Sequence, residues 1–333
     1  MTTPNEPSLP RTVQTSWHGF LETYEPLRTD LYRYCRHLTR SPWDAEDLAQ
    51  DALARAFVTL GQMGHAPPSP RAWLFKVASN LWIDRLRRAR REEVGGVVAG
   101  ATAGDDPRGA REAAGTLIGQ LSPQERAAVV LKDVFDLSLE EAADVLSTTV
   151  GAVKAALHRA RGKLVEAPVE EPSAPRPAVL DAFCEAFNAG DIDRVAALLL
   201  DTSSVEVVGA TTQYGPEAAK RTVLYGMLFG VQRMVAAGSG GIHAPFMQGL
   251  LPKAPRVEAR VHRGSWVLLH WYAHQDGEAV RGLTRIEPDG DRVSRLQNYY
   301  FTPDLIAEVC GELGVPSRLN GSRWWSEAAH LPR

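Results

Sequence analysis

The chain has 333 residues, of which 44% are hydrophobic and 23% charged, and its formal net charge is −3. These values are typical of a globular protein of two or three domains and exclude a chain that is basic throughout, so any contact with nucleic acid must come from local basic patches. No run of about 18 apolar residues occurs and the N-terminus lacks a basic-then-apolar signal, so we expect a cytoplasmic protein with no membrane segment.

Two amphipathic helices are expected after a short polar arm. Apolar and aromatic residues recur at helical spacing over residues 16–40, and Ser41-Pro42 ends this helix. The next helix, residues 43–57, has four acidic residues in its N-terminal half. This acidic edge has two interpretations: compensation of the helix dipole on a solvated face, or a surface for a partner.

A loop and a basic helix come next. Residues 61–70 have the glycine and proline content of a loop. Residues 71–91 hold seven basic residues and one acidic residue, with aromatic residues between the arginines. This combination is typical of proteins that bind single-stranded nucleic acid, in which flat side chains stack on the bases. For Trp73 and Trp82, burial in the core is the better interpretation.

Residues 121–164 are predicted to form a helix-turn-helix. Ser122 with Glu125, and Ser138 with Glu141, have the three-residue spacing of capping boxes. These signals start one helix that ends near residue 135 and a second that ends near residue 146. A third helix, residues 149–164, completes the motif.

The third helix has an apolar face and a basic face. Residues 150–164 hold four basic residues and no acidic one, whereas residues 121–149 hold six acidic and two basic residues. Such a helix can enter the DNA major groove, where basic side chains contact phosphates and its N-terminal residues reach base edges. The alternative is a solvated charged face on an ordinary helical hairpin.

Together these stretches resemble the extracytoplasmic-function (ECF) group of sigma-70 RNA polymerase sigma factors. DAEDLAQDALARAF (residues 44–57) is similar to the helix that binds the polymerase clamp, and AWLFKVASNLWIDRLRRARR (residues 72–91) to the segment that melts and reads the minus-ten element. The third helix then resembles the reader of the minus-thirty-five element. The resemblance covers about residues 16–166 and implies an all-α fold, with core RNA polymerase and promoter DNA as partners.

The resemblance also assigns roles to individual positions. The residues implied to bind polymerase are Asp44, Asp47, Gln50 and Asp51. Those implied to contact the minus-ten element are Asn80, Asp84, Arg87 and Arg88, with Gln62 and His65 as further candidates in the loop. Those implied to contact the minus-thirty-five element are Thr149, Lys154, Ala155, His158, Arg159 and Arg161. Ala155-Ala156 stands where many relatives have Ser-Arg, so we expect a different minus-thirty-five sequence to be read.

Six segments follow from this interpretation. Residues 16–92 and 113–166 are sigma regions 2 and 4, and the glycine-rich residues 93–112 are a flexible linker between them. Residues 167–178 are a proline-rich, extended linker, residues 179–301 a third domain, and residues 302–333 a C-terminal tail. The tail contains an amphipathic helix and Trp324-Trp325, and these apolar residues are expected to seat against the sigma modules.

In the third domain, helices precede a meander of strands. Two helices and a β-branched strand come first, another helix follows Gly215-Pro216, and four alternating runs with Asp-Gly turns come last. This order resembles the SnoaL-like domain of the NTF2-like class, a cone-shaped α+β fold that several ECF groups carry as a C-terminal extension. Its curved sheet and helices would enclose a cavity for a small molecule.

Aromatic and polar residues that alternate along the predicted strands are candidates for lining this cavity, although the sequence alone does not decide which face is the inner one. They are Trp266, His270, Tyr272, Arg285, Gln297 and Tyr299. No metal or other cofactor is expected, because His270 and His274 would lie about 13 Å apart along a strand. No Asp-His pair of the kind used by some enzymes of this fold stands out, so we do not expect an enzyme.

Three functions are compatible with this organisation. A sigma factor with an autoregulatory or ligand-sensing C-terminal domain is favoured, because the acidic helix ahead of the basic helix supplies a polymerase surface. The first alternative is a helix-turn-helix regulator that does not dock on polymerase. The second is an enzyme with a small-molecule pocket and accessory DNA binding.

Overall fold

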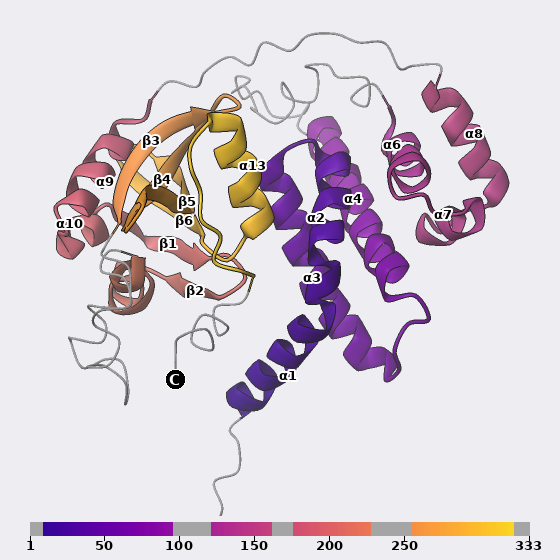
Figure 1. Ribbon diagram of the computed structural model, residues 1–333, viewed down its shortest axis with the longest axis horizontal. Coiled ribbons are helices and arrows are strands. Elements are labelled where there is room, and N and C mark those ends of the chain that lie inside the picture. The colour runs from indigo at the N-terminus through magenta and orange to yellow at the C-terminus, as the bar shows by residue number, and fades with distance from the viewer. Residues whose placement is uncertain (1–8, 96–120, 162–175, 228–254, 323–333) are drawn as a thin grey trace, which may run out of the picture. The chain divides into compact units, whose positions relative to one another are not determined.

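The computed structural model describes residues 9–95, 121–161, 176–227 and 255–322 (Figure 1). The chain divides into two compact units, Met1–Glu170 and Glu171–Arg333. The described part of the first unit is helical, and that of the second combines helices with a six-stranded sheet, which confirms the predicted fold class. Within these ranges no helix is long and apolar enough to span a membrane. Most of both predicted linkers and Trp324-Trp325 lie outside the described residues.

The first part of the N-terminal unit contains the helices α1 (Leu9–Tyr24), α2 (Arg28–Thr39), α3 (Pro42–Met63) and α4 (Pro70–Gly95). A short 3-10 turn, η1 (Glu25–Leu27), separates α1 from α2. The prediction of one helix over residues 16–40 is therefore wrong. The helix begins earlier and divides around Pro26, because proline has no N–H group to donate within a helix.

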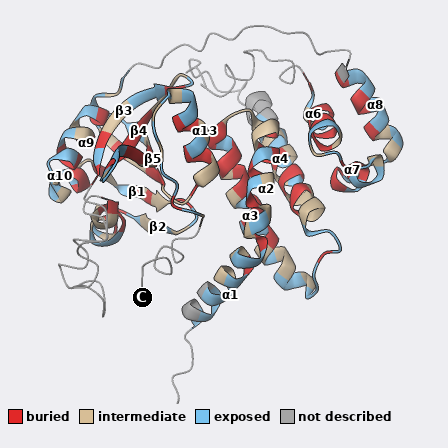
Figure 2. Cartoon of the chain, viewed as in Figure 1, coloured by how far each residue is buried: buried red, intermediate tan, exposed pale blue. Residues whose placement is uncertain are grey.

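The first part contains a buried ion pair. Arg28 and Glu46, which are 5% and 0% exposed, are joined by a bond of 2.5 Å between Nη2 and Oε1. The side chain of Gln50 donates to the same oxygen of Glu46 at 2.7 Å. Helices α2, α3 and α4 all carry buried residues (Figure 2).

The second part of the N-terminal unit is the predicted helix-turn-helix. Its elements are α6 (Pro123–Val129), a π-helical turn η4 (Val130–Val134), α7 (Leu139–Val145) and α8 (Val150–Arg161). Both capping boxes are confirmed: Ser122 exchanges backbone and side-chain hydrogen bonds with Glu125, and Ser138 does so with Glu141. These local signals therefore set where two of the helices begin.

The C-terminal unit places helices before and after a meander of strands. Its helices are α9 (Ala178–Asn188), α10 (Ile192–Ala197), α11 (Pro216–Ala219), the π-helical turn η5 (Lys220–Leu224) and α13 (Pro303–Leu313). Its strands are β1 (Leu199–Val207), β2 (Thr211–Tyr214), β3 (Arg256–His262), β4 (Ser265–His274), β5 (Gly277–Asp289) and β6 (Arg292–Tyr299). The strand order is β2-β1-β6-β5-β4-β3. All neighbours are antiparallel except β1 and β6, which are parallel.

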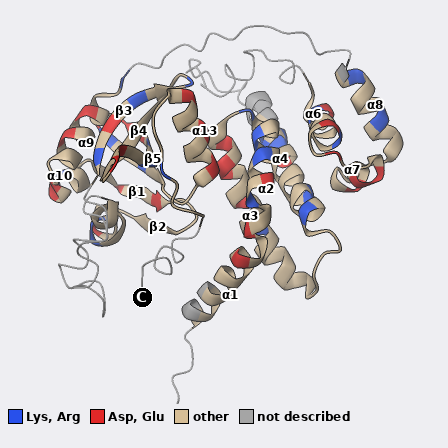
Figure 3. Ribbon diagram, in the orientation of Figure 1, with Lys and Arg blue, Asp and Glu red and all other residues tan. Residues whose placement is uncertain are grey.

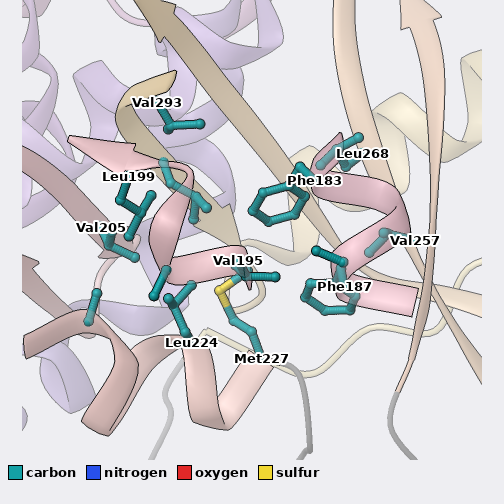
Figure 4. Packing of buried hydrophobic residues seen from close by; sticks show 14 of the residues in the cluster. Phe183, Phe187, Val195, Leu199, Val205, Leu224, Met227, Val257, Leu268 and Val293 are labelled. Atoms are coloured by element: carbon teal, nitrogen blue, oxygen red, sulfur yellow. The ribbon is translucent and has the colours of Figure 1, made fainter. Parts of the chain in front are cut away.

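A hydrophobic cluster fills the space between the first helices of this unit and one face of the sheet (Figure 4). Phe183 and Phe187 of α9 stack with ring centroids 5.8 Å apart. Leu268 of β4 and Leu296 of β6 belong to the same cluster. This contact therefore identifies the helix-covered face of the sheet.

Helix α13 packs within the C-terminal unit, in contact with β5. Its apolar residues Leu305, Ile306, Val309 and Cys310 are all 0% exposed. Glu312 fastens it to the β3–β4 turn by accepting hydrogen bonds of 2.8 Å from His262 Nε2 and Arg263 Nε. The helix therefore belongs to the C-terminal unit, while the expectation that its apolar residues contact the sigma modules stays a prediction.

Candidate functional site

Helix α8 exposes the predicted minus-thirty-five residues on the side away from its packed face. Val153, Ala156, Leu157 and Ala160 are buried, as their spacing predicts. Thr149, Lys154, Ala155, His158 and Arg159 are exposed, whereas the side chain of Arg161 lies outside the described residues. Thr149 also caps the helix, because its Oγ1 accepts the amide hydrogen of Ala152 at 3.1 Å. Figure 3 shows basic residues along α8 and acidic residues on α6 and α7.

Arg159 differs from Lys154 in its contacts. Its Nε donates to Oε1 of Glu125 at 2.9 Å, and the side chain of Glu125 is only 3% exposed. The second oxygen of Glu125 accepts the backbone N–H of Ser122 in the capping box. Arg159 therefore ties the recognition helix to the start of α6, a role that only the tertiary fold reveals. In the described ranges, Lys154 has no ion-pair partner.

Helix α4 separates the predicted minus-ten residues from its buried stripe. Asn80, Asp84, Arg87 and Arg88 are exposed. Asp84 lies 3.5 Å from Arg87 one turn later. Trp82 is 5% exposed and Trp73 is half-buried, in agreement with core roles for both. The exposed face of α4 is therefore polar and basic, while Trp73 and Trp82 lie on its more buried side.

The predicted polymerase-binding residues lie on α3, and several are held by neighbours. Asp44 and Asp51 are exposed, and Asp47 and Gln50 are half-buried. Asp51 forms an ion pair with Arg85 of α4, and Gln50 is bonded to the buried Glu46. One member of this edge is thus joined to α4 by an exposed pair, and another is joined to the core through Glu46. The loop predicted over residues 61–70 is shorter, because α3 continues to Met63 and α4 begins at Pro70. Gln62 therefore lies on the last turn of α3 and His65 in the loop, and both are exposed.

The sheet divides the six predicted pocket residues between its two faces. Trp266 packs on the helix-side cluster, and the His270 ring lies 5.3 Å from that of Phe187 of α9. Tyr272 follows two residues after His270 on the same strand and contacts the ring of Tyr300 at 6.2 Å. Arg285, Gln297 and Tyr299 instead alternate with helix-side residues of β5 and β6 and occupy the opposite face. The six residues therefore cannot all line a single pocket.

His270 belongs to a buried polar cluster that the sequence did not indicate. Its Nε2 lies 2.7 Å from Oγ1 of Thr284, which accepts a further hydrogen bond of 3.0 Å from Asn298. Thr284 and Asn298 are directly paired across β5 and β6. Burial lowers the pKa of His270 to about 3, so the ring is neutral at physiological pH. Only the strand register could have grouped these residues.

Comparison with known proteins supports the interpretation of the N-terminal unit. The models of Sigma-70 region 2 and of Sigma-70, region 4 match residues 23–92 and 111–164. The chain is 31% identical over 282 residues to the ECF RNA polymerase sigma factor SigJ of Mycobacterium tuberculosis, which covers 74% of this chain and 89% of SigJ. The chain belongs to the ECF family of RNA polymerase sigma factors.

Other sigma factors match to different extents. SigW of Bacillus subtilis is 30% identical over 163 residues, which are 44% of this chain and 87% of SigW. The crystal structure of the M. tuberculosis SigJ is 24% identical and covers 86% of this chain and 97% of that one, with a TM-score of 0.30. As an ECF sigma factor, the protein binds core RNA polymerase and promoter DNA.

Lys154→Ala in this sigma factor is expected to weaken binding to all minus-thirty-five sequences by a similar factor. Loss of one phosphate contact lowers the slope of log affinity against log salt by about one, whereas loss of a base contact costs about 1–3 kcal/mol at one position. Titration of promoter DNA with holoenzyme at several salt concentrations measures both. Arg33→Ala, on an exposed part of α2, is the control. An unchanged slope in Lys154→Ala would remove this residue from the phosphate interface.

Acidification is expected to destabilise the C-terminal unit through His270. Its pKa is about 3 in the folded protein and about 6.5 in an unfolded chain. Between these values the unfolded chain holds a proton that the folded chain lacks, so stability falls as pH falls, by roughly 1.4 kcal/mol per pH unit. Urea denaturation of the full chain between about pH 7 and pH 5 measures the slope.

Two histidine variants isolate this effect. His270→Gln retains a partner for Thr284 and should flatten the dependence on pH, whereas exposed His65→Gln should leave it unchanged. If His270→Gln and the wild type lose stability equally over this interval, another group carries the effect.

Proposed function

We propose that the exposed faces of α8, α4 and α3 bind the minus-thirty-five element, the minus-ten element and the polymerase clamp, respectively. The residues are those predicted from the sequence: Thr149, Lys154, Ala155, His158, Arg159 and Arg161; Asn80, Asp84, Arg87 and Arg88; and Asp44, Asp47, Gln50 and Asp51. The supporting observation is that every described member except Asp47 and Gln50 is exposed. The proposed segment boundaries remain those of the sequence, except that α13 joins the third domain.

We further propose that the C-terminal unit regulates the sigma unit by contact and can sense a ligand. The observation that carries this proposal is its own closed core, which makes it a separate folded body linked to α8 through residues 162–175. Such a short connection keeps the effective concentration of the C-terminal unit at the recognition helix high, so even a weak contact is populated. A ligand would then act through different affinities for the docked and undocked arrangements.

Two observations support a regulatory C-terminal unit. The SigJ alignment covers 74% of the chain, whereas the N-terminal unit ends at residue 170 of 333, so the similarity extends into the C-terminal unit. In addition, a general base works best with a pKa near the operating pH, and that of His270 is about 3. We therefore propose a regulator that is not an enzyme and that works in the cytoplasm, where it meets RNA polymerase.

The test compares transcription by the full chain with that by a chain ending at Glu170, using core polymerase and a cognate promoter. The two are expected to differ several-fold in activity or in affinity for polymerase. Residues 176–333 supplied as a separate chain should restore full-length behaviour only at high concentration, because the tether is lost. Equal activity and equal affinity with and without the C-terminal unit would contradict regulation by contact. A deletion from residue 302 is unsuitable, because it removes the buried residues of α13 and their contact with β5.

A further inference from the structure

Helix α8 has an exposed glycine, Gly151, in its first turn. Its φ angle lies outside the left-handed region, unlike those of Gly64 and Gly314, which end α3 and α13. The backbone at Gly151 is therefore helical, a conformation that residues with a side chain adopt readily. Backbone geometry does not explain why a glycine occupies this position.

Packing inside the protein does not explain this glycine either. Apart from its chain neighbours and the backbone of its own helix, a methyl group on Gly151 would meet only Oγ1 of Thr149 among the described residues, at 3.9 Å. Gly282 is the opposite case, because a methyl group there would lie 3.3 Å from Cδ2 of Tyr300 and 3.8 Å from Cβ of His270. The fold therefore crowds a side chain at Gly282 but leaves room for one at Gly151.

A glycine at such a position lowers the stability of its helix. Glycine loses more backbone freedom than alanine when a helix forms, which shifts the equilibrium away from the helix by roughly two- to fivefold at one position. Helix α8 has only 12 residues, and helices of this length depend on packing and on capping. Gly151 thus costs stability without serving the fold, which points to a requirement of a binding partner.

The place of Gly151 on the recognition helix identifies this partner. Other described glycines also lie in helices and have room for a side chain, among them Gly19, Gly61 and Gly311. Gly151 differs because Lys154, Ala155 and His158 are exposed three, four and seven positions after it, the spacing of one helical face. Recognition helices direct their N-terminal residues at base edges in the major groove. Gly151 therefore lies at the end of this face that approaches the bases.

Side-chain volume next to Gly151 is also small. Of the two alanines that stand where many relatives have Ser-Arg, only Ala155 is exposed, whereas Ala156 is 2% exposed and belongs to the packed face. A helix with its side chains is about 10–12 Å wide, and the major groove is about 12 Å wide. A side chain that is missing from the contact face therefore lets the backbone of the helix lie closer to the DNA.

We propose that Gly151 is a close-approach residue for minus-thirty-five DNA. Because it has no side chain, the backbone in the first turn of α8 reaches van der Waals contact with the duplex. The depth of this contact determines which base edges Thr149 and Lys154 reach from either side, so Gly151 is a specificity-determining position. This inference rests on the proposed function of α8, and adds a position at which the absence of a side chain is what the DNA requires.

Substitutions of increasing size test the inference. Gly151→Ala and Gly151→Leu introduce good helix formers, so both variants should keep or raise the urea midpoint of the N-terminal unit. The probe is a promoter fragment selected from a genomic pool by the wild-type holoenzyme. Affinity of the holoenzyme for this fragment should fall roughly tenfold in Gly151→Ala, the size of one lost base contact, and further in Gly151→Leu. Loss of folding cannot lower affinity while stability is kept.

Gly311→Ala is the matched control. Gly311 is an exposed helical glycine of α13, and a methyl group there would meet no atom within 4 Å among the described residues beyond its chain neighbours and its own helix backbone. This variant should leave promoter affinity unchanged. Unchanged affinity in both Gly151 variants would overturn the inference. Unfolding of Gly151→Ala would also overturn it, because the fold itself would then require the glycine.

Lys154→Ala separates failure of the inference from failure of the proposed function. If Lys154→Ala weakens promoter binding while both Gly151 variants bind as the wild type does, α8 remains the DNA-binding helix and only the role of Gly151 is overturned. If all three variants bind as the wild type does, the assignment of this face of α8 to the minus-thirty-five element is overturned as well.

Discussion

Glu46→Ala is expected to lower the free energy of unfolding of the N-terminal unit by about 3–5 kcal/mol, because it leaves the buried guanidinium of Arg28 without its carboxylate. Arg28 is 5% exposed and its bond to Glu46 is 2.5 Å long. The loss is measured by urea denaturation followed through helical circular dichroism. Transcription should fall with it, since α3 and α4 share this core.

The matched control is Asp44→Ala, which removes an exposed carboxylate from the first turn of the same helix. Its effect on stability should be small, although it tests the polymerase surface. Replacement of both partners, Arg28→Met with Glu46→Leu, should recover most of the stability, because a packed apolar pair avoids the cost of burying charge. If Glu46→Ala and Asp44→Ala have the same free energy of unfolding, the buried pair does not determine the stability of the N-terminal unit.

Phe183→Ala is expected to destabilise the C-terminal unit by about 3–5 kcal/mol, as deletion of a fully buried aromatic ring leaves a cavity. Phe183 is 0% exposed and lies in the cluster between α9 and the sheet. In thermal unfolding of the full chain, the midpoint of the C-terminal transition should move to a lower temperature. The midpoint of the N-terminal transition should stay unchanged. Transcription should then approach that of the chain ending at Glu170.

Glu185→Ala on the exposed side of the same helix is the control for this prediction. Its carboxylate pairs at 2.9 Å with Arg194, and exposed pairs of this type contribute little. A shift of the N-terminal transition in Phe183→Ala would mean that the two units do not unfold separately.

Features that depend on a few adjacent residues were predictable from the sequence. The capping boxes at Ser122 and Ser138 place helix starts by hydrogen bonds that span only three residues. The strands of the C-terminal meander likewise follow from alternation and turn residues. The break at Pro26 was missed because the apolar spacing continues across it, and the missing N–H outweighed that spacing.

Features that join distant residues could not be predicted in the same way. The bond from Arg159 to Glu125 spans 34 positions and depends on the angle at which α8 crosses α6. The assignment of Gln297 to one face and Asn298 to the other depends on register, since a shift of one residue exchanges the faces. The apolar face of α13 was predictable from its spacing, but its contact with β5 was not, because spacing shows that a helix buries a face without showing against what.

Because β1 pairs with β6, the C-terminal unit completes its folding later during synthesis than the N-terminal unit. Val205 pairs with Leu296, so this part of the sheet cannot form until β6 has left the ribosome. Every described helix of the N-terminal unit precedes residue 170. At about 5–20 residues per second, β6 follows on the order of ten seconds later. Each newly made molecule therefore passes through an interval in which its sigma unit is complete and its C-terminal unit is still a nascent chain.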